Sequence, residues 1–234
     1  MSTFEDLPFS LDSFSGKVRL FPLPNLVLFP HVMQPLHIYE LRYRDMLEDA
    51  LTGDGLITMV LLAPGWENDY EGWPPLYPVA CLGRITTHFR LADGTYNLLL
   101  LGLKRAKLLY ELKSEHPYRE ARVEIFEDIY SPQQSNRQQY LQKQLREALQ
   151  DLPLLPEAQE QLDQLNESDV SLGMLTDIIS YMLEIDLEKK QALLAEIDVY
   201  RRTELLLDYL REAVDDLHAG KWSCGIFPPL FSAN

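Results

Sequence analysis

The amino-acid sequence predicts an α+β protein, in which a small β-barrel over residues 1–130 precedes an α-helical domain over residues 131–234. A chain of 234 residues is long enough for one large domain or two small ones. Up to residue 130, apolar residues stand in short runs separated by Pro and Gly, which is typical of strands. After the polar segment Ser131–Asn136 they recur at helical spacing. These two patterns define the predicted domains.

The first strands of the predicted barrel are Val18–Phe21 and Leu26–Phe29. Prolines at positions 22, 24 and 30 interrupt them. Because each Pro removes a donor from a strand ladder, the segment suits the edges and corners of a small barrel better than a flat sheet. From Glu40 to Thr52 the apolar residues take helical spacing, and Gly53 follows as a helix end. Leu56–Leu62 returns to the pattern of a strand.

The strongest turn signal in the predicted barrel is Asp93-Gly94, which separates two apolar-rich runs within Arg84–Leu101. An Asp-Gly pair supplies the positive φ angles that a tight turn between twisted strands requires. The segment therefore predicts a β-hairpin. Ala106–Leu112 and Arg122–Ile129 complete the predicted strands.

Apolar stripes define the helices of the second half. The first two stripes lie within Leu141–Leu152 and Leu172–Met182. Each stripe is apolar on one side only, so these helices must pack on each other or on the barrel. The tail over residues 221–234 is rich in apolar residues and is expected to dock on its own protein.

Two aspartates are placed to begin the remaining helices. Asp186 precedes a short helix over Glu188–Ile197, and Asp198 precedes the last helix. A carboxylate at this position accepts hydrogen bonds from the free backbone N–H groups of the first turn. The last helix aligns four apolar residues on one face and is expected to end at Gly220. They are Leu206, Leu210, Ala213 and Leu217.

The charge balance argues against polyanionic partners. The chain has 21 Lys and Arg against 36 Asp and Glu, a net charge of −15. Nucleic acid and anionic membrane surfaces are both bound through basic residues, so neither is expected as a partner.

There is no apolar run of the roughly 18 residues needed for a membrane span, and the acidic N-terminus does not resemble a secretory signal. Cys81 and Cys224 lie far apart in the sequence, so no disulfide framework is indicated. We therefore expect a reduced, cytoplasmic protein.

No constellation of catalytic residues stands out. The sequence contains no P-loop, no nucleophile elbow and no His-Glu-x-x-His motif, and its five histidines are dispersed. His37, between apolar residues and near a proline, is expected in an extended segment rather than as a metal ligand. Adjacent carboxylates are frequent, but neighbours on a helix or a strand do not point at one substrate atom. No cofactor, metal or catalytic residue is therefore predicted.

Three hypotheses from different classes remain at this point. The first is a non-catalytic polypeptide-recognition or adaptor module. The second is a hydrolase whose metal or carboxylate site is not visible in the sequence. The third is an RNA-binding module, which the charge of −15 disfavours. The partner and the oligomeric state do not follow from composition or spacing.

Four segments within Val18–Ala50 resemble a known family. They are Leu20-Phe21-Pro22-Leu23, Leu28-Phe29-Pro30, Pro35-Leu36-His37-Ile38-Tyr39-Glu40 and Arg42-Tyr43. In this order they resemble the opening of the N-terminal, substrate-binding domain of Lon proteases. The resemblance continues at Gly83-Arg84-Ile85, Asp93-Gly94-Thr95-Tyr96 and Pro117-Tyr118, and in the helical half at Lys190-Gln191-Ala192-Leu193-Leu194, Asp198 and Arg201-Arg202.

This resemblance implies a PUA-like β-barrel followed by an α-helical bundle, the division that periodicity predicts independently. It also implies a module that binds unfolded or tagged polypeptides, or docks a partner protein. The ATPase and Ser-Lys peptidase motifs of full-length Lon do not occur in these 234 residues, so no catalytic residue is transferred. We expect a standalone, non-enzymatic member of the family.

An aromatic segment, Pro64–Pro78, lies between two predicted strands and holds two of the three tryptophans. Its rings are Trp66, Tyr70, Trp73 and Tyr77. Loops on a rigid scaffold concentrate recognition residues, and Trp and Tyr are frequent in binding hot spots. The interleaved carboxylates of Glu67, Asp69 and Glu71 would favour an apolar segment flanked by Lys or Arg. The alternative is that the rings fold back and cap the barrel.

Overall fold

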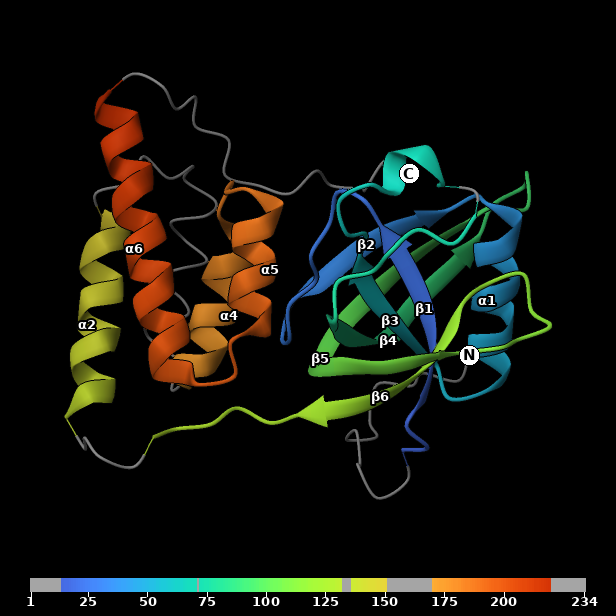
Figure 1. Ribbon diagram of the computed structural model, residues 1–234, viewed down its shortest axis with the longest axis horizontal. Helices are drawn as coiled ribbons and strands as arrows, with labels where there is room; N and C mark the ends of the chain where they lie inside the picture. The colour runs from blue at the N-terminus through green and yellow to red at the C-terminus, as the bar shows by residue number, and fades with distance from the viewer. Residues whose placement is uncertain (1–13, 71, 132–135, 151–169, 220–234) are drawn as a thin grey trace. The chain divides into compact units, whose positions relative to one another are not determined.

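The computed structural model describes residues 14–70, 72–131, 136–150 and 170–219. The chain divides into two compact units: the first ends at Phe126 and the second begins at Glu127 (Figure 1). In the described residues, one unit is a mixed sheet with an α-helix and the other is helical, so the predicted α+β class is confirmed. The finer division into domains of residues 1–130 and 131–234 stays a prediction. None of the helices in the described ranges is long and apolar enough to cross a membrane.

Six strands form the sheet of the first unit. They are β1 (Lys17–Leu23), β2 (Met33–Ile38), β3 (Leu56–Leu61), β4 (Val79–Arg90), β5 (Tyr96–Leu112) and β6 (Glu120–Phe126). Their order is β2-β5-β4-β3-β1-β6, and β6 also pairs with β5. Five strands are therefore hydrogen-bonded in a closed circuit, and β2 extends the sheet beyond it on the far side of β5. Strands β1 and β3 pair in parallel, whereas the other pairs are antiparallel.

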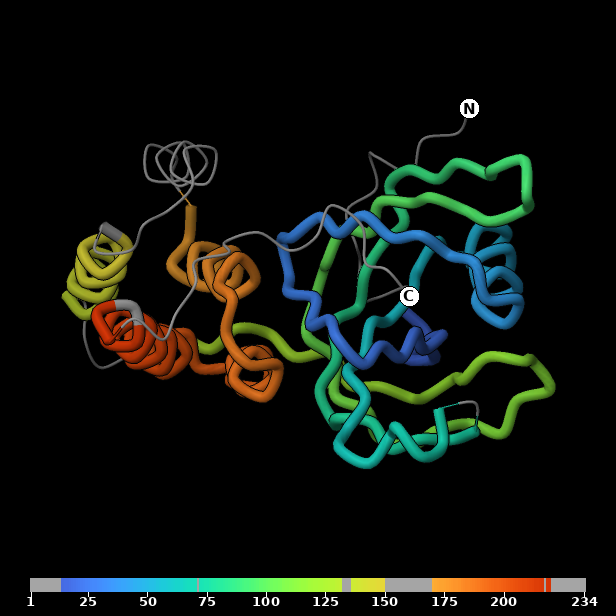
Figure 2. Tube along the Cα trace, turned by 90° about the horizontal axis from the view of Figure 1, so that it is seen from above, coloured from blue at the N-terminus to red at the C-terminus, as the bar shows by residue number. Residues whose placement is uncertain are grey.

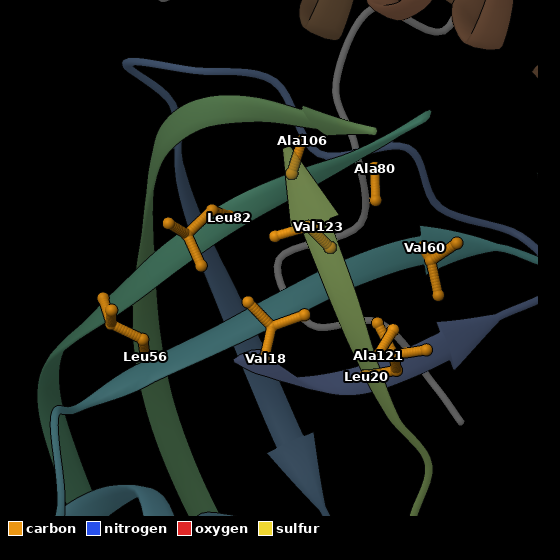
Figure 3. Packing of buried hydrophobic residues seen from close by; sticks show 9 residues of the cluster. All are labelled: Val18, Leu20, Leu56, Val60, Ala80, Leu82, Ala106, Ala121 and Val123. Atoms are coloured by element: carbon orange, nitrogen blue, oxygen red, sulfur yellow. The ribbon is translucent and has the colours of Figure 1, made fainter. Parts of the chain in front are cut away.

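The inward-facing side chains of the circuit form an apolar cluster (Figure 3). Its buried members come from all five strands of the circuit: Val18, Leu20, Leu56, Val60, Ala80, Leu82, Ala106, Ala121 and Val123. Three of these are alanines, and the others are leucines and valines. The partly buried Phe14 packs against the same cluster. Alternation of inward and outward residues along each strand thus produces one dry interior.

Among the described residues of the first unit, the one α-helix is α1 (Leu41–Thr52), in agreement with the predicted segment from Glu40 to Thr52. It buries four residues on one face: Tyr43, Met46, Leu47 and Ala50. The Tyr43 ring packs on Phe21 of β1, with the ring centroids 4.6 Å apart. The helix also contacts β3, so it covers the outer side of the parallel β1–β3 pair. Figure 2 shows α1 beside the sheet.

The predicted hairpin is confirmed, and its strands are longer than expected. Strands β4 and β5 pair from Arg90↔Tyr96 at the turn to Val79↔Lys107, and Gly94 has the positive φ of 85° that the turn requires. Ala106–Leu112, predicted as a separate strand, is the continuation of β5. His37 lies in β2, as its extended interpretation predicts.

The prediction of a strand at Leu26–Phe29 is wrong. These residues have no regular secondary structure, although Val27, Leu28 and Phe29 are buried. The apolar run therefore reflects burial and not strand pairing. Prolines at 24 and 30 bracket it, and the chain regains the sheet only when His31 N donates to the carbonyl oxygen of Gly102.

Four helices are described in the second unit. They are α2 (Arg137–Gln150), α4 (Leu172–Met182), α5 (Leu187–Ala195) and α6 (Val199–His218). Helix α6 packs against each of the other three. Asp198 caps α6 as predicted, because its Oδ1 accepts hydrogen bonds from the backbone N–H groups of Tyr200 and Arg201. Asp186 stands at the N-cap position of α5 without a side-chain capping bond. Leu152, Gly220 and the tail over 221–234 lie outside the described residues.

A buried arginine organises this second unit. The guanidinium of Arg202 on α6 is fully buried and donates to both carboxylate oxygens of Asp128, at 3.0 and 2.8 Å. It also donates to the carbonyl oxygen of Glu196, and its Nε lies 3.2 Å from the buried carboxylate of Asp177 on α4. One cation therefore joins the segment before α2 to α4 and α6.

Candidate functional site

The aromatic loop, Pro64–Pro78, connects β3 to β4 and is fixed at both ends by backbone hydrogen bonds. Ala63 N donates to the carbonyl oxygen of Pro75, and Tyr77 N donates to that of Leu61. Gly65 has a φ of 96°, a conformation that L side chains rarely adopt, and it begins the short 3₁₀ helix η3 (Trp66–Asn68). The loop therefore leaves the sheet as a closed turn whose two ends run side by side.

The first half of the loop is held by the ion pair between Glu40, which precedes α1, and Arg42 in the first turn of α1. The Tyr70 hydroxyl donates to Glu40 Oε1 at 3.0 Å, and Glu40 Oε2 accepts from Arg42 Nε at 3.0 Å. The Arg42 guanidinium lies over two rings, 5.3 Å from the centroid of Tyr70 and 4.7 Å from that of Tyr43. Trp66 meets Tyr70 edge-on at 5.8 Å. These contacts bring Tyr70 back against the body of the unit.

The second half of the loop is held by a different ion pair. Arg119 donates to both carboxylate oxygens of Glu111 on β5, at 2.7 and 2.6 Å, and to the carbonyl oxygen of Pro74. The Trp73 indole Nε1 donates to Glu111 at 2.9 Å, while the Arg119 guanidinium lies 5.2 Å from the ring centroid. Even so, Trp73 is 58% exposed. Its ring is thus fixed in orientation and presents one face to solvent.

The electrostatics of this region suit recognition better than proton transfer. Burial, with the Glu40 carboxylate beside the hydroxyl, raises the pKa of Tyr70 to about 12, so the phenol stays protonated near neutral pH. The pocket between Arg42, Tyr43, Tyr70 and Arg119 holds about 10 Å³, barely one water molecule. It has no room for a small-molecule substrate. What the loop offers is a surface.

The structure divides the four predicted rings between two environments. Trp66, Tyr70 and Tyr77 are half-buried, whereas Trp73 is exposed. Trp66 and Tyr70 are in contact, and Trp73 packs instead with Arg119. The four charged residues that hold Tyr70 and Trp73 in place were not predicted from the sequence. They are Glu40, Arg42, Glu111 and Arg119; the first two belong to the segments that carry the family resemblance.

A second, polar pocket of about 260 Å³ lies beside β1. Its charges are already paired: Lys17 with Glu120 at 2.8 Å, and Arg19 with Asp49 and Asp54 at 2.6 and 2.7 Å. Although burial acts in the opposite direction, the hydrogen bonds from Arg19 and from the Tyr118 hydroxyl lower the pKa of Asp49. Within the described ranges, no three His, Cys, Asp or Glu side chains are grouped to hold a metal ion.

Comparison with known proteins gives consistent results. Residues 17–212 match the family model of the ATP-dependent protease La (LON) substrate-binding domain. Lon protease 2 of Myxococcus xanthus is 31% identical over 82% of this chain, and Lon protease of Anaeromyxobacter dehalogenans is 30% identical over 88%. In both cases the match covers 23% of the relative, so the chain spans about a quarter of the length of the curated relatives it matches.

Solved structures support the same fold. The N-terminal domain of Mycobacterium avium complex Lon protease matches 84% of this chain and 98% of its own, with a TM-score of 0.65 and 17% identity. A Lon N-terminal domain protein from Xanthomonas campestris matches 82% of the chain and 98% of its own, with a TM-score of 0.56 and 21% identity. With the family model matching most of its length, the chain belongs to the Lon substrate-binding domain family.

Proposed function

We propose that this chain is a non-catalytic module that recognises polypeptide segments, either unfolded or tagged substrates or a partner protein. The observation that supports it most is the match of residues 17–212 to the Lon substrate-binding domain, which is distinct from the ATPase and peptidase parts of Lon. An adaptor role fits the same match. In either role the chain binds and does not cleave.

The aromatic loop supports this proposal with a suitable contact residue. Binding of a flexible polypeptide costs less when the receptor side chains are already fixed. Trp73 meets that condition, because Glu111 and Arg119 set its orientation while more than half of its surface stays exposed. Trp66 and Tyr70 would form the adjoining edge of the contact. We propose that the loop is one place where an apolar segment docks.

The fold suggests how such a loop is kept rigid. We infer that the closed circuit of β1, β3, β4, β5 and β6 is a PUA-like barrel and that the helices of the second unit form a bundle. In a closed barrel both strands that flank the loop are paired on each side, so the ends of the loop cannot separate. A rigid scaffold with exposed loops is the usual arrangement for recognition.

The experiment that tests the proposal measures binding of the full chain to an array of short overlapping peptides from an unrelated protein. We expect binding to peptides with apolar stretches, and loss of much of it in the double variant Trp66→Ala/Trp73→Ala with an unchanged melting temperature. Tyr140→Ala is the matched control, because Tyr140 is 61% exposed but lies on α2. If the double variant binds normally but melts earlier, the rings only cap the barrel. If the wild-type chain binds no peptide, the proposal is wrong.

A further inference from the structure

The polar pocket beside β1 plays no part in the proposed contact at the aromatic loop. Its lining comes from the start of β1, from the end of α1 with the turn that follows it, and from the start of β6 with the segment before it. Its volume of about 260 Å³ lies below the roughly 300–1,000 Å³ of small-molecule sites, so it suits a single side chain of a larger ligand. The charged and titratable residues of the lining are Lys17, Arg19, Asp49, Asp54, His116 and Glu120.

The cations of this pocket are already occupied. Arg19 Nε donates to Asp49 Oδ2 at 2.6 Å, and Nη1 donates to Asp54 Oδ1 at 2.7 Å. Nη2 donates to the carbonyl oxygen of Asp49 at 3.5 Å, so each of the three nitrogens has a partner. Lys17 Nζ lies 2.8 Å from Glu120 Oε1. An anionic ligand would have to displace these carboxylates.

The carboxylates, in contrast, have free acceptor atoms. Asp49 Oδ1 and Asp54 Oδ2 accept no hydrogen bond from any residue that the structure describes, and both side chains are partly exposed. The Glu120 side chain is only 6% exposed. Although burial acts in the opposite direction, the hydrogen bonds from Lys17 and Ser114 lower the pKa of Glu120, so it is charged near neutral pH. Three carboxylates therefore face two fixed cations in the pocket.

We propose that this pocket binds an arginine side chain of the polypeptide that the chain recognises. The inference rests on the proposed function and adds a charged residue to the recognised segment. A guanidinium has five N–H donors in a planar fork, which suits free oxygens on two separate carboxylates better than a compact ammonium does. The net charge of −15 attracts cationic ligands, and the carboxylates interleaved in the aromatic loop favour the same kind of segment.

The N-terminal segment of the chain does not supply this cation. Residues 1–13 lie next to Phe14 and Ser15 in the sequence, and Ser15 lines the pocket. This segment contains Glu5, Asp6 and Asp12 but no Lys or Arg. Its carboxylates would be repelled by those of the pocket, so a guanidinium has to come from elsewhere.

The test titrates the full chain with N-acetyl-arginine amide, and with N-acetyl-citrulline amide as the neutral analogue of the same shape. Binding is followed by two-dimensional ¹⁵N–¹H NMR. Neither compound has an apolar core, so the measurement reports on the pocket and not on the aromatic loop. We expect the arginine compound to shift the backbone amide signals of Arg19, Asp54 and His116, and the citrulline compound to leave them in place.

Two variants change the pocket in opposite directions. Asp54→Asn keeps the Oδ1 atom that accepts from Arg19 and from the backbone N–H of Leu56, but it removes the negative charge. It should weaken arginine binding roughly tenfold, the loss expected for one hydrogen bond to a charged group. Lys17→Gln should strengthen arginine binding, because it removes a cation that competes for Glu120.

Asp93→Asn is the matched control. Asp93 Oδ1 accepts from the backbone N–H of Thr95 at 3.0 Å, just as Asp54 Oδ1 accepts from that of Leu56 at 3.1 Å. The two substitutions therefore make the same chemical change and the same change in net charge. Asp93 lies in the turn between β4 and β5 and does not line the pocket, so arginine binding should be unchanged.

The outcomes separate this inference from the proposed function. The inference is wrong if the arginine compound shifts none of these signals, if the citrulline compound shifts them equally, or if Asp54→Asn binds as tightly as Asp93→Asn; peptide binding at the aromatic loop is then unaffected. Inorganic phosphate that shifts these signals in place of arginine would assign the pocket to anions and also overturn the inference. A chain that binds the arginine compound but no peptide of the array would refute the proposed function, and with it the polypeptide as the source of the guanidinium.

Discussion

The Thr58 hydroxyl is a buried polar group whose removal should stabilise the protein. Thr58 lies in the middle of β3 and pairs with Leu20 of β1 and Leu82 of β4, two members of the apolar cluster. Its side chain is fully buried, and Oγ1 has no hydrogen-bond partner among the described residues. Thr58→Val replaces the hydroxyl with a methyl group of nearly the same shape, so the packing is retained.

The magnitude follows from the cost of desolvating an unbonded hydroxyl, about 1–3 kcal/mol. We expect Thr58→Val to raise the free energy of unfolding by about 1 kcal/mol, at the lower end because the hydroxyl is small and uncharged. For a chain of this size the melting temperature would rise by about 2–4 °C. Urea unfolding followed by circular dichroism measures the change directly.

Thr203→Val is the matched control for this substitution. Thr203 is also fully buried, but its hydroxyl donates to the carbonyl oxygen of Val199 at 2.7 Å and lies 3.0 Å from Thr176 Oγ1. The same chemical change there should cost about 1–2 kcal/mol, because it leaves a buried carbonyl and a hydroxyl with fewer partners. If Thr58→Val also destabilises the protein, the hydroxyl has a partner and the reasoning is refuted.

Two further predictions concern the helical unit. Arg202→Met should lower the free energy of unfolding by about 3–5 kcal/mol, because the change removes the cation facing the carboxylates of Asp128 and Asp177. Urea unfolding measures this change, and a decrease below about 1 kcal/mol would contradict the prediction. Burial lowers the pKa of Lys190, which donates to the carbonyl oxygen of Tyr181, to about 8. The unfolded chain then binds more protons than the folded one above pH 8, so the free energy of unfolding should rise from pH 8 to about 9.5, and Lys190→Met should abolish that rise.

Features of the fold that depend on nearby residues could be predicted from the sequence. The Asp93-Gly94 turn determines its hairpin through its own backbone angles, and Asp198 caps a helix that begins at the next residue. Leu26–Phe29 shows the limit of this approach. A short apolar run is compatible with a strand or with buried irregular chain, and the distinction depended on contacts with Gly102, far away in the sequence.

The candidate site shows the same limit more sharply. The residues that hold Tyr70 and Trp73 are Glu40 and Glu111, 30 and 38 positions away, so no local pattern links each ring to its anchor. The sequence left binding and capping as exclusive alternatives for the four rings. The structure assigns different environments to different rings: Trp66 and Tyr70 cover part of the unit, and Trp73 is fixed yet exposed. A recognition surface on this loop would require both environments, because the contacts of Tyr70 with Glu40 and Arg42 hold the chain from which Trp73 projects.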